Sequence, residues 1–304
     1  MDFERPVPPG GYIWWYVDGF SDDGRHAITL IVFIGSVFSP YYAWAGRGDP
    51  ENHCAFNLAL YGDRKRWTMT ERASRALARD AAQLSIGPSR ISWSSQGFLA
   101  EIDEMSVPVP RRVRGRIHVS PHSVCSQLYS LDPDGRHVWR PIATMADIRV
   151  EVSEPRLSWT GAGYIDMNYG AVPLEQDFRS WNWSRGRSGR GANIFYDTVL
   201  KNGVTRQVSL AFDGSGRASP IAPPPVGELP RASIWRMPRA ARSDANVPPR
   251  VIETLEDTPF YARSLIEQCC EGERMRAIHE SVSLQRFDTP IVKAMLPFRM
   301  PRRP

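Results

Sequence analysis

The chain has 304 residues, enough for one large domain or two medium ones. An apolar fraction of 42%, a charged fraction of 23% and a mean hydropathy of -0.37 exclude a disordered chain, a fibrous repeat and a polytopic membrane protein. The 38 Lys and Arg residues against 33 Asp and Glu residues leave a net charge of +5. This mild excess fits contact with anionic lipid better than nucleic-acid binding.

The chain carries no secretory or disulfide signature. Its cysteines are Cys54, Cys125, Cys269 and Cys270, without a CxxC spacing, so we expect neither a disulfide framework nor a zinc site. The first residues contain neither a basic segment nor an apolar core that precedes a small-residue cleavage site. We therefore expect a cytoplasmic protein with free thiols.

The first long apolar stretch runs from residue 26 to residue 46 and has the length of a membrane-spanning helix. It contains the β-branched run Ile28–Val32, however, and the strand-like segment Tyr12–Val17 precedes it across the turn sequence Asp22–Arg25. We therefore predict a buried β-hairpin here rather than a span, and we leave contact with a membrane interface open.

Strand-like segments recur at short spacing along the rest of the chain. They are His53–Leu60, Arg90–Trp93, Phe98–Ile102, Val113–Val119, His137–Ile142, Ile148–Val152, Gly163–Asn168, Ile194–Val199, Gln207–Phe212, Ala232–Trp235, Tyr261–Cys269 and Met275–Ser283. Glu271–Arg274 predicts a hairpin turn between the last two, and Thr70–Gln83 is the clearest helical segment. This pattern predicts an all-β protein of sandwich or barrel type, with one domain over residues 1–155 and another over 156–304.

Two further features favour ordinary structural roles. The glycine- and arginine-rich run Ser184–Gly191 predicts a solvated loop, and contact with phosphate or a lipid headgroup is the alternative. His118 and His122 are four residues apart, but a strand-to-loop setting argues against a metal pair. No GxSxG, HExxH or GxGxxG motif occurs, so we expect no metal and no cofactor.

Two dipeptide-spaced pairs are candidates for chemistry. His137 and Trp139 follow one turn sequence, and Tyr164 and Asp166 follow another. Because residues two apart on a strand point to the same face, each pair places one ring and one polar group together. If both pairs line one interior, an imidazole, a carboxylic acid and two electron-rich rings converge there. In most β-proteins such pairs are packed aromatics beside turn-anchoring polar groups, and this reading stays open.

That combination suits the protonation of an unactivated alkene. A carboxyl group in an apolar site has its neutral form favoured by desolvation, so Asp166 can act as the acid. The faces of Trp139 and Tyr164 stabilise the resulting carbocation, by about 0.5–2 kcal/mol each. His137 positions or deprotonates the water that adds to it. Trp181 and Trp183 are candidate substrate-binding residues, although a Trp-x-Trp pair is more often part of a core.

Several long blocks resemble one family, the carotenoid 1,2-hydratases (hydroxyneurosporene synthases) of purple photosynthetic bacteria. The blocks are GGYIWWYVDGFSDDGRHAITLIVFIGSVFSPYYAWAGRGDPENHCAFNLALYG, WTMTERA, IGPSRISW, GYIDMNYG, WNWSRG, HESVSLQRF and MLPFRMPR. The resemblance implies two tandem lipocalin-like β-barrels. It also implies a cofactor-independent hydro-lyase that adds water across the terminal C1=C2 bond of acyclic carotenes such as neurosporene and lycopene. The product is a 1-hydroxy-1,2-dihydro carotenoid.

The resemblance assigns the family's catalytic His-x-Trp and Tyr-x-Asp pairs to His137, Trp139, Tyr164 and Asp166, with Asp166 as the proton donor. A long hydrocarbon substrate implies peripheral association with the photosynthetic inner membrane. The candidate contacts are the aromatics of Pro40–Tyr42 and the basic tail Phe298–Pro304. Two other functions stay open on the same fold: a carotenoid carrier without catalysis, and a protonation-initiated terpene cyclase. Asp166 separates the carrier from the enzyme, because a carrier has little use for an acid in an apolar interior.

Overall fold

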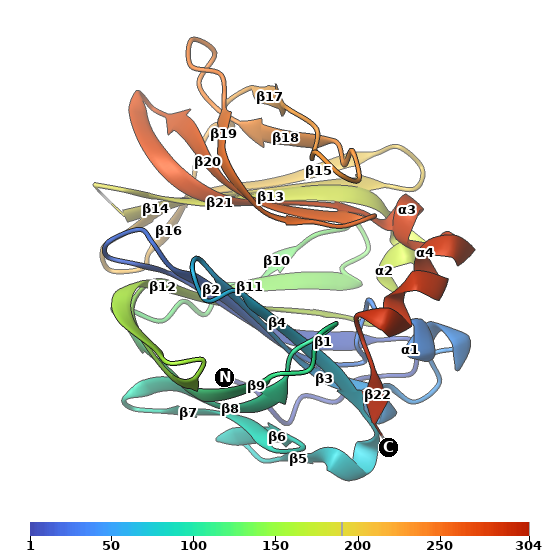
Figure 1. The fold of residues 1–304 in the computed structure, drawn as a ribbon. Helices are drawn as coiled ribbons and strands as arrows, with labels where there is room; N and C mark the ends of the chain where they lie inside the picture. Colours follow the sequence, from blue (N-terminus) through green and yellow to red (C-terminus); the bar gives the residue numbers. More distant parts are fainter. Residues whose placement is uncertain (190, 304) are drawn as a thin grey trace. The chain divides into compact units, whose positions relative to one another are not determined.

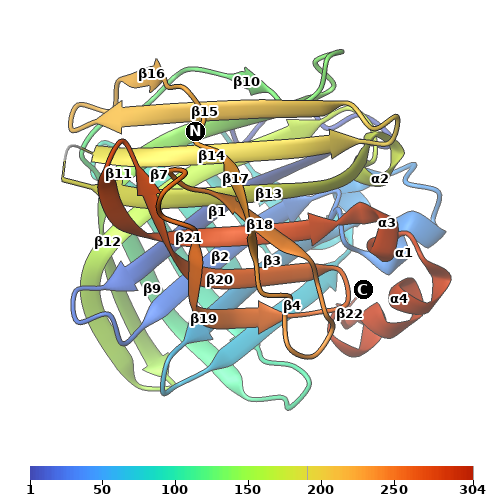
Figure 2. The same ribbon diagram turned by 90° about the horizontal axis from the view of Figure 1, so that it is seen from above.

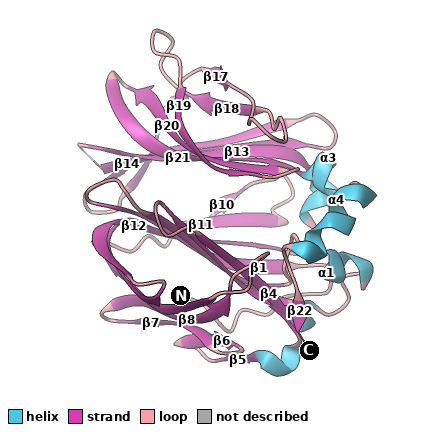
Figure 3. Ribbon diagram, viewed as in Figure 1, coloured by secondary structure: helices cyan, strands magenta, loops and turns pink. Residues whose placement is uncertain are grey.

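The computed structural model describes residues 1–189 and 191–303, and this part of the chain is mostly β-structure (Figure 3). It divides into two compact units. Unit 1 comprises Met1–Leu128, His137–Pro173 and Ala294–Pro304, and unit 2 comprises Tyr129–Arg136 and Leu174–Lys293. The predicted boundary after residue 155 falls in the turn between two paired strands of unit 1.

Unit 1 is built from one long sheet in the order β22-β4-β3-β2-β1-β12-β11-β9-β8-β7-β6-β5 (Figure 1). Its strands are β1 (Tyr12–Ser21), β2 (Ala27–Ile34), β3 (Cys54–Tyr61), β4 (Arg66–Arg72), β5 (Leu77–Arg79), β6 (Gln83–Ile86), β7 (Ser89–Ser94), β8 (Gly97–Met105), β9 (Arg112–Pro121), β11 (His137–Glu154), β12 (Leu157–Gly170) and β22 (Arg302–Arg303). The short helix α1 (Pro40–Trp44) and the 3₁₀ turns η1 (Pro50–Asn52), η2 (Ser74–Ala76) and η3 (Leu296–Phe298) connect them.

This sheet curls until β4 meets the end of β8. The two segments join at the bridge between Thr68 and Ser106 and at the hydrogen bond of 2.9 Å from Val107 N to Trp67 O. The concave face encloses an apolar core to which almost every strand contributes, including Ile13, Trp15 and Val17 of β1. Because the sheet curls around one face, its opposite face is available for a functional site.

The predicted hairpin at the start of the chain is confirmed. β1 and β2 pair antiparallel from Ile13 opposite Ile34 to Phe20 opposite Ala27. The apolar residues of 26–34 are thereby paired as a strand, with Ile28, Leu30 and Val32 in the core. Among the described residues no helix is long and apolar enough to cross a bilayer.

Unit 2 contains a seven-stranded sheet in the order β16-β15-β14-β13-β21-β20-β19, and the small pair β17-β18 packs against it (Figures 1 and 2). Its elements are β10 (Tyr129–Ser130), α2 (Leu174–Asp177), β13 (Phe178–Ser188), β14 (Gly191–Leu200), β15 (Thr205–Asp213), β16 (Ala218–Pro220), β17 (Val226–Leu229), β18 (Arg239–Arg242), β19 (Arg250–Asp257), β20 (Tyr261–Cys270), β21 (Glu273–Ser283) and α3 (Leu284–Phe287). Helix α4 (Pro290–Met295) begins in unit 2 and ends in unit 1.

Some sequence predictions are wrong in detail. The helix expected over Thr70–Gln83 is absent; β4 ends at Arg72 there, and η2 and β5 follow. Burial explains the difference, because Glu71 and Arg72 are both buried in ion pairs that a surface helix does not offer. Ala232–Trp235 is a turn rather than a strand. The loop expected at Ser184–Gly191 is mostly the end of β13, and its residue 190 lies outside the described residues.

Candidate active site

The central strands of unit 1 carry polar and aromatic side chains on the face opposite the core. β12 pairs with β1 on one side and with β11 on the other, and cross-strand partners share a face. Members of this face, called the polar-aromatic face below, are Tyr12, Trp14, Tyr16, Asp18, His137, Trp139, Tyr164, Asp166 and Asn168. Each is at most 8% exposed. All four predicted catalytic residues therefore lie on one buried surface.

Asp166 is the meeting point of two of the predicted partners. Trp139 Nε1 donates a hydrogen bond of 2.9 Å to Asp166 Oδ2, and the Tyr164 hydroxyl donates one of 2.8 Å to the same oxygen. Asp166 itself is 5% exposed. Hydrogen-bond donors favour a carboxylate and desolvation favours the neutral acid. The carbonyl oxygen of a neutral acid also accepts hydrogen bonds, so this arrangement is compatible with a proton on Oδ1.

His137 is held by a residue that the sequence prediction did not include. A hydrogen bond of 2.9 Å joins the Tyr12 hydroxyl to His137 Nδ1, and the two rings stack with centroids 5.8 Å apart. Tyr12 and His137 lie on the strands that flank β12, and both are register partners of Gly170. The bond therefore passes over a residue without a side chain. A Cβ at Gly170 would lie 2.8 Å from His137 Nδ1, closer than real contacts allow.

Aromatic rings extend this face along β1 and β2. Tyr12 stacks on Trp14 with ring centroids 5.0 Å apart, and Trp14 contacts Phe33 of β2 at 6.1 Å. Tyr16 meets Tyr164 edge to face at 6.1 Å. Electron-rich ring faces attract a cation through their quadrupole. The face thus combines two carboxyl groups, one imidazole and a wall of rings suited to a transient positive charge.

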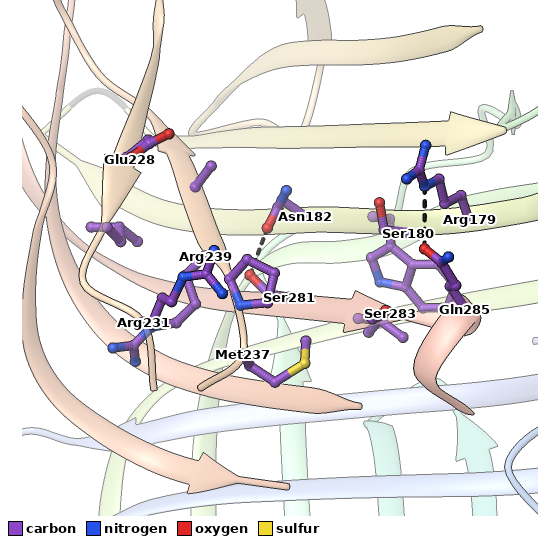
Figure 4. A pocket seen from close by; sticks show the side chains of 15 residues that line it. Arg179, Ser180, Asn182, Glu228, Arg231, Met237, Arg239, Ser281, Ser283 and Gln285 are labelled. Carbon is purple, nitrogen blue, oxygen red and sulfur yellow. Dashed lines mark hydrogen bonds between the residues drawn. The ribbon is translucent and has the colours of Figure 1, made fainter. Parts of the chain in front are cut away.

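Trp181 and Trp183, the predicted substrate-binding residues, belong to β13 of unit 2, where both are buried. Trp181 lines a cavity of about 380 Å³ between β13, β21 and the β17-β18 pair (Figure 4). The lining is largely polar: Arg179 donates to Gln285, Ser281 donates to Asn182, and the buried Arg239 projects into the same space. These two tryptophans therefore belong to unit 2, whereas the four predicted catalytic residues belong to unit 1.

Most of the residues of this face that sequence reasoning missed lie on β1. Tyr12, Tyr16 and Asp18 join the site because β1 pairs with β12, a strand about 150 residues further along the chain. The local signal for two of them was present, since Tyr16-Val17-Asp18 repeats the Tyr-x-Asp spacing of Tyr164-Ile165-Asp166. This repeat matters only because β1 pairs with β12, and the spacing of residues along the sequence does not reveal that pairing.

Solved structures of the same fold class come from proteins of very different sequence. An AttH protein from Nitrosomonas europaea superimposes with a TM-score of 0.61 at 13% identity, covering 89% of this chain and 92% of that one. Kievitone hydratase from Nectria haematococca superimposes with a TM-score of 0.51 at 9% identity, covering 93% and 92%. At these identities the likeness concerns the fold alone.

Sequence comparison identifies the family. The family model described as carotenoid hydratase CrtC matches residues 30–304. The acyclic carotenoid 1,2-hydratase of Thiocapsa roseopersicina is 49% identical over 99% of this chain and 75% of its own length. The enzyme of the same name from Rubrivivax gelatinosus is 49% identical over 99% and 76%, and that of Cereibacter sphaeroides is 40% identical over 90% and 98%. The chain therefore belongs to the carotenoid hydratase CrtC family, and the resemblance seen in the sequence is confirmed.

Proposed function

We propose that this protein is an acyclic carotenoid 1,2-hydratase, a hydro-lyase that adds water across the terminal C1=C2 bond of an acyclic carotene. Family membership and two relatives of this name, each 49% identical over 99% of this chain, support the substrate class. The observation that carries the chemistry is the convergence of Trp139 and Tyr164 on one oxygen of the buried Asp166.

The first step is proton transfer from Asp166 to C2 of the end group. An alkene is a weak base, so the donor has to be a neutral acid in a site from which bulk water is excluded. Trp139 and Tyr164 hold Oδ2 and direct the proton-bearing Oδ1 to the substrate. Protonation at C2 places the charge on C1, which carries two methyl groups, so the more stable tertiary cation forms.

The second step is capture of the cation by water. The rings of Trp139 and Tyr164 stabilise the charge without forming a bond to it. His137, fixed by Tyr12, positions the water that attacks C1. The new C–O bond gives a tertiary alcohol, and the proton released by the water passes to a base in the site. The reaction consumes one water and no net proton, and the scheme uses no metal and no redox cofactor.

Two structural proposals accompany this function. Each unit is a lipocalin-like barrel, which the curled sheet of unit 1 and the β17-β18 pair over the sheet of unit 2 support. Trp181 and Trp183 contact the polyene. The polar lining of the adjacent cavity suits a hydrocarbon poorly, so the support for this second proposal is the apolar surface of the two indole rings alone.

We also propose peripheral contact with the membrane that holds the substrate. The structure changes which residues of the first candidate segment can reach a membrane. Tyr42 is fully buried and donates to Gly11 O, whereas Trp44 at the end of α1 is 58% exposed. In the C-terminal segment Arg302 is tied to Glu71 and His53, whereas Phe298 is 80% exposed. Trp44 and Phe298 are therefore the side chains that would enter a bilayer interface.

The deciding experiment is incubation of the purified protein with lycopene or neurosporene in liposomes, without added cofactor, followed by product mass analysis. A product heavier by one water supports a hydratase. An unchanged mass with a new chromatographic position indicates a cyclase, and unchanged carotene bound to protein indicates a carrier. Asp166→Asn should retain carotene binding and lose hydration; hydration at the wild-type rate would show that Asp166 is not the acid.

A further inference from the structure

β1 carries a second copy of the Tyr-x-Asp pair, directly beside the first. The two strands are antiparallel neighbours, with Tyr16 opposite Asp166 and Asp18 opposite Tyr164. Each aspartate therefore lies opposite the tyrosine of the other strand, and a local twofold relation connects the pairs. By the geometry of antiparallel sheets, the two aspartates are diagonal neighbours with Cα atoms about 7–8 Å apart.

The two pairs also share their hydrogen bonding. The Tyr16 hydroxyl donates to Asp18 Oδ2 at 3.1 Å, as the Tyr164 hydroxyl does to Asp166 Oδ2 at 2.8 Å. Asp18 is fully buried and Tyr16 is 5% exposed. Burial of a carboxyl group costs free energy. Asp18 is thus a buried carboxyl group beside the proposed acid, and the mechanism above gives it no task.

We propose that Asp18 is the base of the hydration and that Asp166 is its acid, an assignment that rests on the proposed function. Asp166 gives its proton to C2 and becomes a carboxylate. Water then forms the C1–O bond, and its O–H bond breaks as Asp18 takes the proton. Transfer of that proton from Asp18 to Asp166, through water in the site, restores the starting state. Atoms and charge balance, and only the substrates are consumed.

The placement of the two carboxyl groups favours divided roles. Asp18 and Asp166 lie on the same buried face of two neighbouring strands, so a water held over this face can lie within reach of both. Tyr16 on the same strand donates to Asp18, and Tyr164 of β12 and Thr29 of β2 lie directly opposite it. Asp166 is the acid because Trp139 and Tyr164 together fix Oδ2 as its acceptor oxygen.

The test separates protonation from water capture. The protein is incubated in D₂O with lycopene in liposomes, and both the product and the recovered carotene are analysed for deuterium. Wild type should give product with deuterium bound to carbon. Asp18→Asn should lower hydration by about 100-fold or more, while the recovered carotene gains deuterium, because the cation still forms and then loses a proton again. Asp166→Asn should lose both hydration and exchange.

Controls make each result decisive. Thr29→Val alters the buried side chain directly opposite Asp18 without removing a carboxyl group, and it should hydrate normally. If Asp18→Asn does not fold, Asp18→Glu serves instead, since a carboxyl group displaced by one methylene should reduce hydration more than exchange. Hydration at the wild-type rate in Asp18→Asn, or loss of exchange together with hydration, overturns the proposal. Absence of hydrated product from wild type would instead refute the proposed function.

Discussion

Gly170→Ala tests whether the link between Tyr12 and His137 matters for catalysis. The added Cβ would lie 2.6 Å from Tyr12 Cε1 and 2.8 Å from His137 Nδ1. Ordinary van der Waals contact begins near 3.4 Å, so each ring has to retreat by about 0.6–0.8 Å. The hydrogen bond of 2.9 Å between them then breaks or lengthens. Displacements of about 1 Å cost up to about 100-fold in rate when they misplace a catalytic group.

Stability should change much less than activity. Replacing glycine by alanine in a strand normally stabilises it by about 0.5–1 kcal/mol, whereas overpacking costs about 1–3 kcal/mol. We therefore expect turnover of lycopene to fall 10- to 100-fold, with a loss of about 1–2 kcal/mol in the free energy of denaturant unfolding. Gly48→Ala is the matched control, because its Cβ would meet nothing within 4 Å.

A double mutant shows whether the clash acts through this bond. Tyr12→Phe removes the hydroxyl and should lower turnover by about 2- to 10-fold, the value of one neutral hydrogen bond. Added to Gly170→Ala it should cost little more, because the bond is already broken. Wild-type turnover in Gly170→Ala, or strictly additive losses in the double mutant, would refute the assigned role of Tyr12.

Three further predictions concern stability and membrane contact. Burial lowers the pKa of His279 to about 4, so the unfolded chain, whose histidine titrates near pH 6.5, binds the extra proton between these values. The free energy of unfolding should therefore fall as pH decreases from 6.5 to 4, by up to about 3 kcal/mol, and His279→Gln should flatten that slope in urea titrations. Burial also raises the pKa of Glu104 despite its bidentate bond to Arg72; Arg72→Met should cost about 3–5 kcal/mol in the same assay, and adding Glu104→Leu should recover most of it. Trp44→Ala with Phe298→Ala should weaken sedimentation with anionic liposomes and leave turnover in detergent unchanged; undiminished sedimentation would argue against these contacts.

Local patterns predicted the strands well because burial and alternation are properties of neighbouring residues. The hairpin turn at Glu271–Arg274 is confirmed between β20 and β21 for this reason. The sequence pattern failed where side chains form hydrogen bonds with residues far away in the sequence. Thr70–Gln83 has the composition of a surface helix, yet Arg79 donates to the backbone of Phe3 and Arg5, contacts that no local rule anticipates.

The candidate site shows the same division between what is local and what is not. Period-two spacing placed His137 with Trp139 and Tyr164 with Asp166, because each pair lies on one strand. Spacing could not reveal that both strands flank one another or that β1 completes the face. Tyr12 was therefore invisible as the partner of His137, although it lies in a segment already predicted as a strand.

The burial pattern of β1 argues that this site is more than a packing arrangement. Its odd-numbered residues Ile13, Trp15 and Val17 fill the apolar core, and that alone would satisfy a strand of a curled sheet. Its even-numbered residues from Tyr12 to Asp18 are polar or aromatic and are also buried, so the strand removes hydroxyl and carboxyl groups from water outside that core. Apolar residues of similar size would make a more stable sheet. The proposed hydration by a separate acid and base gives both buried carboxyl groups of this face a task.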